Sequence, residues 1–562
     1  MTVMPSISGR ILRCPLALLP ALALLALALP LEGQTPPSVF EPISTPVETR
    51  QFGDLAEGPY NRLVIRNVMV IPGHGGPPTG PHDILIEGNL ITEMRSFDPV
   101  AAERAAQAGQ PLERLTGDRI IEGEGMYVMP GMIDLHYHVR TEPIPLEYSY
   151  YLKLAHGTTT TVTVTDGRFD QVWADEMARR EFSKLAPRQH PFWNWGFQAN
   201  ATREQLEDPA EAPRIAREMM AAGARSVGIN GLTWNPEVFG AAARAVTAAG
   251  GVTTVHLPPS NLAILNAVEA AREGVTFIKH HYGLAESALP RRSQSFERGY
   301  NYNDESHRFR AAAQVWEEVG WNPESRARLL NDVADSLVHY GAKMMPTMVV
   351  YEASKDILRA QGLPWHERYT HQALLDWSVP SPHWHGAFHW DWSSDDEESW
   401  RYAFDLWGQL IYQFNKRGGE VAFGTDDNYI WATAGFSTVR ELQLVRQSGM
   451  HSLEVLRTAT YNSARALLEP HLGLVRPGYL ADLIIVDGNP ADNFRHLYSF
   501  GAIRMAEDGS MYRSRGIVHT IIDGVVTENA NLMREVANMV ADSKRDVEPL
   551  ITQQPFLPPG HR

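Results

Sequence analysis

Short apolar runs separated by Gly- and Pro-containing turns open and close the chain, and they predict β-strands at both ends. The runs cover residues 63–71, 83–92, 119–122, 481–487 and 518–526. β-branched residues dominate them, as is typical of strands in a half-buried sheet. Because these strands flank a long middle section, we predict one composite β-sandwich that is built from residues 60–127 and 465–530.

Between residues 128 and 464, strand-like apolar runs alternate with helical patterns. Strands are expected at residues 158–165, 224–229, 252–256, 275–281, 342–350 and 420–426, and helices at residues 211–222, 236–249 and 262–273. This alternation predicts parallel βαβ units and an α/β fold. Seven or eight such units fit the length of a (β/α)8 TIM barrel, whose chemistry lies at the C-terminal ends of its strands.

A segment rich in Trp and His, residues 351–402, breaks this alternation. An insertion of this length over the active face of a barrel is often a lid or a wall of the substrate pocket. Within it, His383 and His385 are separated by one residue, but they follow Pro382 rather than a strand. We therefore interpret this pair as part of a loop, without a metal role.

The N-terminal residues 1–34 have the pattern of a secretory signal peptide. Arg10 and Arg13 precede an almost continuous Leu/Ala run, and residues 26–28 (ALA) form a small-residue cleavage pattern. The run is short for a membrane span, so export to the periplasm or medium is expected after cleavage, with an uncleaved anchor as the alternative. Residues 35–59 are interpreted as an extended arm and residues 531–562 as a C-terminal tail.

Composition narrows the chemistry further. The formal net charge of -16 argues against a nucleic-acid partner and favours a small-molecule substrate. Cys14 is the only cysteine and lies inside the signal, so the mature chain has no thiolate ligand or nucleophile. Any metal must then be held by His and carboxylate groups. Composition leaves self-assembly into a homo-oligomer open.

One strand end carries a pair of candidate metal ligands. Residues 127–138 read YVMPGMIDLHYH and end in His136 and His138. Side chains alternate between the two faces of a strand, so these imidazoles point the same way. Two neutral imidazoles on one face form half of a transition-metal site.

The motif around this pair resembles the first barrel strand of the amidohydrolase superfamily. Further matches in the family's order are residues 157–162, 274–280, 424–426, 459–464 and 473–487. Within the superfamily, the imidazolonepropionase-like and Xaa-Pro dipeptidase-like branch is the most similar. The resemblance implies a TIM barrel with a divalent metal at its C-terminal face. The ligands it implies are His136, His138, His256, His280 and Asp426.

The resemblance also implies roles for these residues. Three imidazoles and a carboxylate suit zinc, and a bound water would then have a pKa of roughly 7 and supply hydroxide. Asp426 would shuttle the proton, and His280 would ligate the metal or polarise the carbonyl. Relatives with two metals use a carboxylated lysine where this chain has Gly228, so one metal is predicted. His281, adjacent to His280, is expected to face away from the site.

The substrate is less well defined by the sequence. Arg168, Asn230, Tyr282 and Tyr351 follow predicted strands and are candidate substrate-binding residues. The leading hypothesis is an exported metal-dependent hydrolase of an amide-like or cyclic amide carbon–nitrogen bond. The alternatives are a mononuclear deaminase of an amino-heterocycle and an Xaa-Pro-type dipeptidase. A non-catalytic binding module is the alternative of another class, and the complete set of five candidate ligands argues against it.

Overall fold

The computed structural model describes residues 48–289, 299, 301 and 304–545. The expected signal peptide, residues 1–34, lies outside these residues, as do residues 35–47 of the expected arm. The rest of the arm contains two short strands, β1 (Arg50–Gln51) and β2 (Ala56–Gly58). Strand β2 pairs with β20 (Val525–Thr527), so this part of the arm belongs to a sheet.

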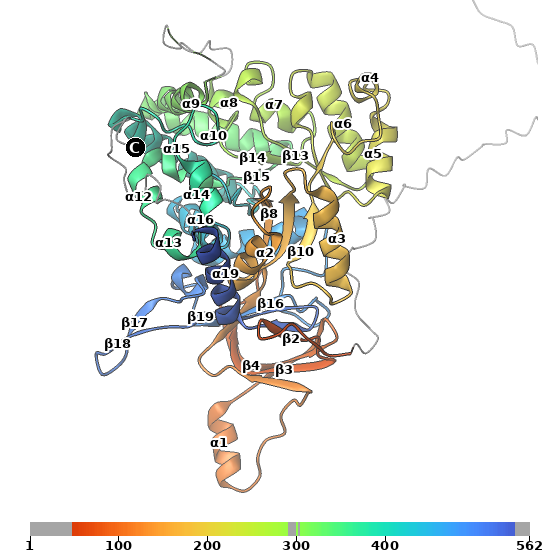
Figure 1. The fold of residues 1–562 in the computed structure, drawn as a ribbon, viewed down its shortest axis with the longest axis vertical. Helices are drawn as coiled ribbons and strands as arrows, with labels where there is room; N and C mark the ends of the chain where they lie inside the picture. The colour runs from red at the N-terminus through yellow and green to blue at the C-terminus, as the bar shows by residue number, and fades with distance from the viewer. Residues whose placement is uncertain (1–47, 290–298, 300, 302–303, 546–562) are drawn as a thin grey trace, which may run out of the picture. The chain divides into compact units, whose positions relative to one another are not determined.

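Strands from both ends of the chain form one ten-stranded sheet. Its other members are β3 (Arg62–Val70), β4 (Thr79–Glu87), β5 (Leu90–Ser96), β6 (Arg119–Glu122), β7 (Tyr127–Pro130), β16 (Leu483–Asp487) and β19 (Gly516–Ile522). The order β1-β2-β20-β19-β16-β7-β3-β4-β5, with β6 on β3, places strands distant in sequence side by side (Figure 1). The composite origin of this sheet agrees with the predicted one, while its assignment as a two-layer sandwich stays a prediction.

The middle of the chain contains two parallel sheets. One has the order β10-β9-β8 and the other the order β11-β12-β13-β14-β15. Their strands are β8 (Met132–His138), β9 (Thr158–Val164), β10 (Arg188–Pro191), β11 (Trp193–Asn194), β12 (Ser226–Gly228), β13 (Val252–Val255), β14 (Phe277–Lys279) and β15 (Lys343–Met345). The parallel βαβ organisation predicted from the apolar pattern is therefore present.

Backbone contacts continue beyond the edges of these two sheets. Met344 and Val421 form an isolated parallel bridge, and the Leu135 N–H donates to the Phe423 carbonyl at 2.9 Å. The expected eighth strand, residues 420–426, has no regular strand beyond this bridge, and Asp426 at its end adopts a positive φ angle of 55°. A residue in that conformation does not continue a strand. A closed eight-stranded barrel stays a prediction.

Helices cover these sheets between and after the strands. They are α2 (Leu146–Ala155), α3 (Phe169–Arg180), α4 (Arg203–Leu206), α5 (Ala212–Ala221), α6 (Pro236–Ala248), α7 (Ala267–Arg272), α8 (Leu284–Ala288), α9 (Glu305–Gly320), α10 (Pro323–His339), α16 (Phe436–Gln447), α17 (Ser452–Arg457) and α18 (Ser463–Ala466). The predicted helix 262–273 is shorter than expected. The reason is that Asn266 accepts a bond from the Glu269 N–H and so caps the helix at residue 267.

The Trp- and His-rich insertion folds into short helices. They are α11 (Met348–Tyr351), η3 (Glu352–Lys355), α12 (Ile357–Gln361), α13 (His366–Tyr369), α14 (Gln372–Ser378) and the start of α15 (Ser394–Lys416). Trp400 and Trp407 of α15 are buried with exposures of 0% and 1%. These tryptophans therefore serve the core, rather than the surface of the insertion.

The residues expected as a tail begin with a helix, α19 (Asn529–Ser543). It lies against α2 and buries Leu532, Val536 and Val540. Figure 1 shows α19 beside α2 and β19. The apolar residues recur at helical spacing, which explains why this segment is helical and docked. Among the residues that the structure describes, no helix has both the length and the apolar character needed to cross a membrane.

Candidate active site

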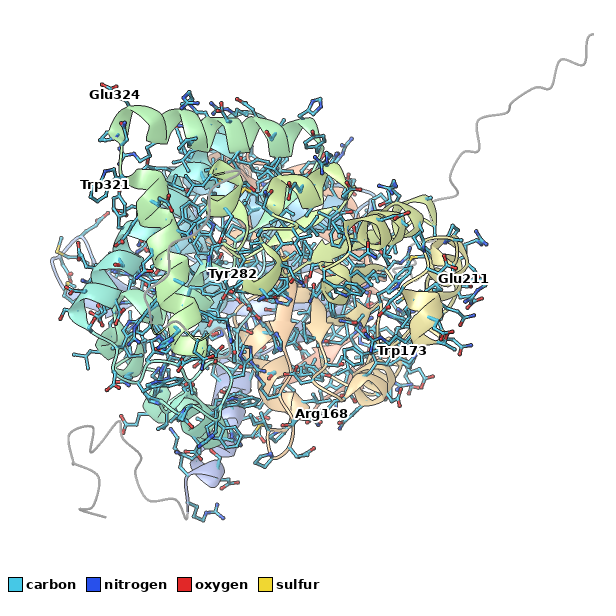
Figure 2. The ribbon with its side chains drawn as sticks, turned by 90° about the horizontal axis from the view of Figure 1, so that it is seen from above. Arg168, Trp173, Glu211, Tyr282, Trp321 and Glu324 are labelled. Carbon is cyan, nitrogen blue, oxygen red and sulfur yellow. The ribbon has the colours of Figure 1, made fainter. Side chains whose placement is uncertain are left out.

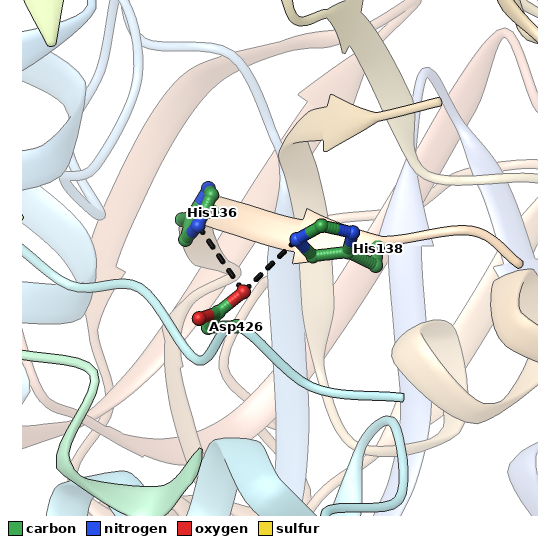
Figure 3. Close-up of side chains that lie close together, drawn as sticks. All are labelled: His136, His138 and Asp426. Atoms are coloured by element: carbon green, nitrogen blue, oxygen red, sulfur yellow. Dashed lines mark ion pairs between the residues drawn. The ribbon is translucent and has the colours of Figure 1, made fainter. Parts of the chain in front are cut away.

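Two imidazoles and one carboxylate converge at the end of strand β8. The Asp426 Oδ1 lies 3.2 Å from the His136 Nε2 and 3.0 Å from the His138 Nε2. Figure 3 shows both histidines on one side of the strand, with Asp426 facing them. One ligand atom from each of the three residues lies within 4.8 Å of the others. Nitrogen and carboxylate donors at this separation suit a transition-metal ion.

An irregular loop presents the Asp426 carboxylate. The N–H groups of Thr425 and Asp426 both donate to the His136 carbonyl, at 3.1 and 2.6 Å. Asp426 adopts a φ of 55°, and Ile430 and Trp431 further along adopt 43° and 63°. Such conformations are unfavourable for residues with large side chains and persist where the surrounding structure holds them. The loop that places the Asp426 carboxylate beside β8 is therefore held in a strained backbone conformation.

His280 and His256 complete the predicted set and lie next to these three residues. The His280 Nδ1 is 3.8 Å from the Asp426 Oδ2 and 2.6 Å from the Thr347 Oγ1. The rings of His256 and His280 have centroids 4.6 Å apart. His281 packs instead between Tyr351 and Trp400, at centroid distances of 4.7 and 5.2 Å. All five predicted ligands therefore border one space.

A carboxylate behind His138 orients its ring. The two Asp166 oxygens each lie 3.2 Å from the His138 Nδ1, and the Arg140 Nη1 donates to Asp166 at 2.9 Å. A hydrogen bond from Nδ1–H leaves the lone pair of Nε2 free for a metal. Asp166 was not predicted, although its position just after the second strand was a usable signal.

Burial keeps most of these imidazoles neutral. Desolvation lowers the pKa of His136 to about 4 and that of His256 to about 3. Burial and Arg140 lower the pKa of His138, but Asp166 and Asp426 outweigh them and raise it. The pKa of Asp426 is low because His136 and His138 outweigh its desolvation. Neutral imidazoles and an ionised carboxylate are the states that bind metal, so the donor set fits a divalent cation.

Lys279 is a buried amine beside this group that the sequence interpretation missed. Its Nζ lies 3.1 Å from the His136 Nδ1, and burial lowers its pKa to about 7. Its place directly before His280 was the available signal.

Gly228 of strand β12 has no side chain that could bind a metal. A Cβ added at this position would lie 2.1 Å from the Phe192 ring. The aromatic ring thus occupies the space that a longer residue at 228 would need.

A cavity of about 860 Å³ opens above these side chains. Asn230, Tyr282 and Tyr351, three of the predicted substrate-binding residues, line it. Arg168 is not among its described lining residues and instead donates to the carbonyls of Arg140 and Ile144 at 3.0 and 2.8 Å. Figure 2 places Tyr282 within the fold, in contrast to Trp321 at its edge.

Glu305, His385 and Tyr429 are among the further lining residues that were not predicted. The Glu305 Oε1 lies 2.6 Å from the His385 Nδ1. His385 belongs to the loop pair in the insertion, so this loop forms part of the cavity wall. The contact between Glu305 of α9 and His385 of this loop is formed only in the tertiary fold. No local sequence pattern predicts it.

Comparison with known proteins relates part of this chain to a known family. The profile of the amidohydrolase family matches residues 411–527. Short stretches resemble adenine deaminases, with 43% identity over 51 residues to the Clostridium perfringens enzyme and 35% over 104 residues to the Staphylothermus marinus enzyme. These matches cover 9% and 18% of this chain and only 9% and 15% of those enzymes.

Solved structures resemble the chain over most of its length. A bottromycin amidohydrolase has a TM-score of 0.55 at 16% identity, covering 86% of this chain and 91% of the other. A Xaa-Pro dipeptidase with bound methionine has a TM-score of 0.51 at 16% identity, covering 83% and 100%. At such identities the likeness concerns the fold alone. The profile match concerns residues 411–527, and the fold of the chain is similar to that of solved amidohydrolase and dipeptidase structures.

Proposed function

We propose that this protein is a metal-dependent hydrolase of a carbon–nitrogen bond in an amide-like or cyclic amide substrate, built on a (β/α)8 barrel. The convergence of His136, His138 and Asp426 at the end of β8 carries this proposal. The match of residues 411–527 to the amidohydrolase family and the neighbouring His256 and His280 support it. The cavity above them provides room for a substrate of moderate size.

His136, His138 and Asp426 would hold the cation, with His256 and His280 close enough to share in binding it. A bound divalent ion such as zinc acidifies water and polarises a carbonyl. We propose a single ion, because Gly228 provides no bridging side chain on β12. Zinc is favoured by the nitrogen-rich donor set, and other divalent metals fit the same ligands.

The chain's own groups then manage proton transfer and orientation. The Asp426 carboxylate accepts the proton of the attacking water and returns it to the departing nitrogen. His280, fixed by Thr347, orients the substrate carbonyl. Asp166 keeps His138 in the tautomer that presents Nε2. Asn230, Tyr282 and Tyr351 are proposed to contact the substrate from the cavity wall, and the aromatic rings of the wall exclude bulk water.

Deamination of an amino-heterocycle is the second candidate. The short sequence matches to adenine deaminases favour it, since deamination also hydrolyses a carbon–nitrogen bond. A panel of amides and amino-heterocycles separates the two activities. Release of ammonia from the heterocycles alone would establish the deaminase, and release of an amine from the amides would establish the hydrolase proposed first.

The Asp426→Asn variant tests the shared chemistry. The amide side chain cannot take up the proton, so turnover of any substrate should fall by about 10²–10⁴-fold. The Asp170→Asn variant, which changes an exposed carboxylate on α3, is the matched control. Circular dichroism checks that both variants fold. Unchanged turnover in Asp426→Asn refutes the proton shuttle, and two stoichiometric ions in protein purified without chelator refute the single-metal proposal.

We also propose that the protein is exported. The basic residues before the Leu/Ala run and the ALA pattern at 26–28 support this proposal. Expression of the full chain in a Gram-negative host, followed by cell fractionation and N-terminal sequencing, tests it. A chain that starts near residue 29 or near residue 34 in the periplasmic fraction is the expected product. An intact N-terminus in the cytoplasmic fraction contradicts it.

A further inference from the structure

Phe and Tyr rings from several elements line the cavity. They are the rings of Phe169, Phe192, Phe197, Tyr282, Phe309, Tyr351 and Tyr429. Aromatic rings in a binding site favour aromatic ligands, because two rings bury a large apolar area and adopt favourable stacked or edge-to-face arrangements. A volume of about 860 Å³ accommodates a ligand with more than one ring.

A second layer of rings holds this wall in place. Phe309 stacks on Phe388 with centroids 3.6 Å apart, and Tyr351 lies parallel to Trp400 at 6.2 Å. Phe388 and Trp400 are both fully buried. Side chains packed in this way cannot move aside without leaving a void. The aromatic surface is therefore preformed, which lowers the cost of binding a flat ligand.

Charged groups in the wall are already paired with one another. The Arg140 Nη1 lies 2.9 Å from Asp166, and its Nε donates to the Asn428 carbonyl at 2.6 Å. Glu305 pairs with His385 at 2.6 Å and lies 3.9 Å from Arg308. The remaining nitrogen of Arg140, Nη2, has no hydrogen-bond partner, but it is buried and its guanidinium packs on the rings of Trp377 and Tyr429, with centroids 4.8 and 4.7 Å away. A substrate charge could therefore engage these groups only if the packing or the pairs around them were disturbed.

Lys279 is a charged group of the wall without such a carboxylate partner, and it lies beside His136. Among the described residues of the wall, it is the one lysine or arginine without a carboxylate within 4.0 Å. Its side chain is 2% exposed and contacts His136 and the Phe192 ring, at 3.1 and 4.3 Å. An amine held there cannot reach a charged group at the far end of a substrate.

We propose that the cavity selects bulky aromatic amides that have neither a free carboxylate nor a free ammonium group. This inference rests on the proposed hydrolase function and specifies its substrate class. A zwitterionic dipeptide would bury two charges against rings and against charges that are already paired. Burial of an uncompensated charge is costly, whereas a blocked aromatic amide gains ring contacts without that cost.

Four matched substrates separate charge from aromaticity. They are phenylalanyl-phenylalanine and leucyl-leucine, each as the free dipeptide and as the N-acetylated, C-amidated form. The metal-loaded wild-type protein should hydrolyse the blocked aromatic compound with kcat/KM about tenfold or more above each of the others. Higher kcat/KM for either free dipeptide overturns the inference and leaves the hydrolase proposal intact.

A binding measurement keeps the inference separate from catalysis. Calorimetry with the metal-free protein should show the blocked aromatic compound binding about tenfold more tightly than its free counterpart. If none of the four compounds is cleaved, this measurement still decides the inference, while the lack of cleavage counts against the proposed function. Equal affinities for the free and blocked aromatic compounds overturn the inference.

Variants of two aromatic residues provide the structural control. Phe309→Leu should weaken binding of the blocked aromatic compound by about three- to tenfold and leave the blocked aliphatic compound nearly unchanged. Trp321→Leu removes an aromatic ring that is 87% exposed and does not line the cavity, so it should change neither affinity. Thermal unfolding verifies that both variants are folded. An equal loss for both ligands in Phe309→Leu contradicts recognition by ring contact.

Discussion

The ammonium group of Lys153 lies 2.6 Å from the Asp134 carboxylate, and both side chains are fully buried. The same ammonium lies 2.7 Å from Asp427. Asp134 also accepts bonds from the N–H groups of His136 and Thr425, both at 3.1 Å. One buried cation from α2 therefore ties strand β8 to the segment that carries Asp426.

Removal of this cation should damage both stability and metal binding. Lys153→Met leaves two buried carboxylates without their counter-charge, which costs about 3–5 kcal/mol of unfolding free energy. The metal affinity should fall as well, because His136 and Asp426 lose their common anchor. Urea unfolding and metal titration measure the two effects.

A second substitution distinguishes charge from packing at this position. In the double variant Lys153→Met/Asp427→Leu, only Asp134 remains, and Thr425 and the His136 N–H still satisfy it. We expect part of the lost stability to return, since apolar replacements of buried ion groups are often tolerated. A double variant less stable than Lys153→Met contradicts this account.

Asp166 should affect metal affinity more than stability. Asp166→Asn weakens the acceptor that holds the His138 Nδ1–H, so the affinity for zinc should fall by about 10–100-fold. Competition with a chromogenic chelator measures this affinity. Asp170→Asn, an exposed change on the neighbouring helix, is the control and should bind zinc like the wild type. Indistinguishable affinities for the two variants would show that Asp166 does not support the ligand.

A buried arginine joins the parallel strands to the composite sheet. Arg188 of β10 pairs with Asp482 at 2.8 Å and also contacts Asp523 in the turn between β19 and β20. Arg188→Met should lower the unfolding free energy by about 3–5 kcal/mol, because the buried Asp482 loses its partner and Asp523 keeps only Arg179 and Asn89. Arg203→Met breaks the exposed pair with Glu207 and should cost about 1 kcal/mol or less. Equal losses in chemical denaturation contradict the prediction.

Glu441 should make stability fall as the pH rises. Burial, with help from Asp134 and Glu352, outweighs its backbone hydrogen bonds and raises its pKa to about 8 from the ordinary 4.5. Between these pH values the folded protein holds a proton that the unfolded chain has released, so stability declines through this window.

The Glu441→Gln variant isolates that contribution. Glutamine does not titrate and retains an oxygen for the Val349 N–H, which donates to Glu441 at 2.7 Å. The melting temperature of the variant minus that of the wild type should therefore become more positive from about pH 5 to about pH 9. Differential scanning calorimetry at several pH values measures this difference, and a constant difference rules out the raised pKa.

Much of the architecture could be predicted because it depends on local patterns. Apolar runs with turns located the strands at both ends, and the alternation of strands and helices indicated parallel units. The five proposed ligands were found by motif, and the structure groups them around one space. Strand lengths were less accurate: residues 420–426 contain one isolated bridge, at Val421, and Asp426 at their end adopts a left-handed conformation.

The remaining site residues could not be predicted, because their roles come from contacts between distant segments. Glu305 and His385 are 80 residues apart, as counted along the chain, yet their side chains lie 2.6 Å from each other. Lys279 precedes a predicted ligand, but only the fold shows its amine beneath His136. Arg168 follows a strand as the substrate candidates do, and the structure instead uses it to hold the carbonyls of the neighbouring loop.

The sequence alone indicates the resemblance to the amidohydrolase superfamily, the order of the strands along the chain and the residues at the ends of those strands. These properties follow from the periodicity of side chains on a strand and from short motifs. The tertiary structure decided which of those residues share a space, which charges cancel and which rings form the wall. Burial and pairing depend on neighbours from other elements, so they emerge only when the segments pack together.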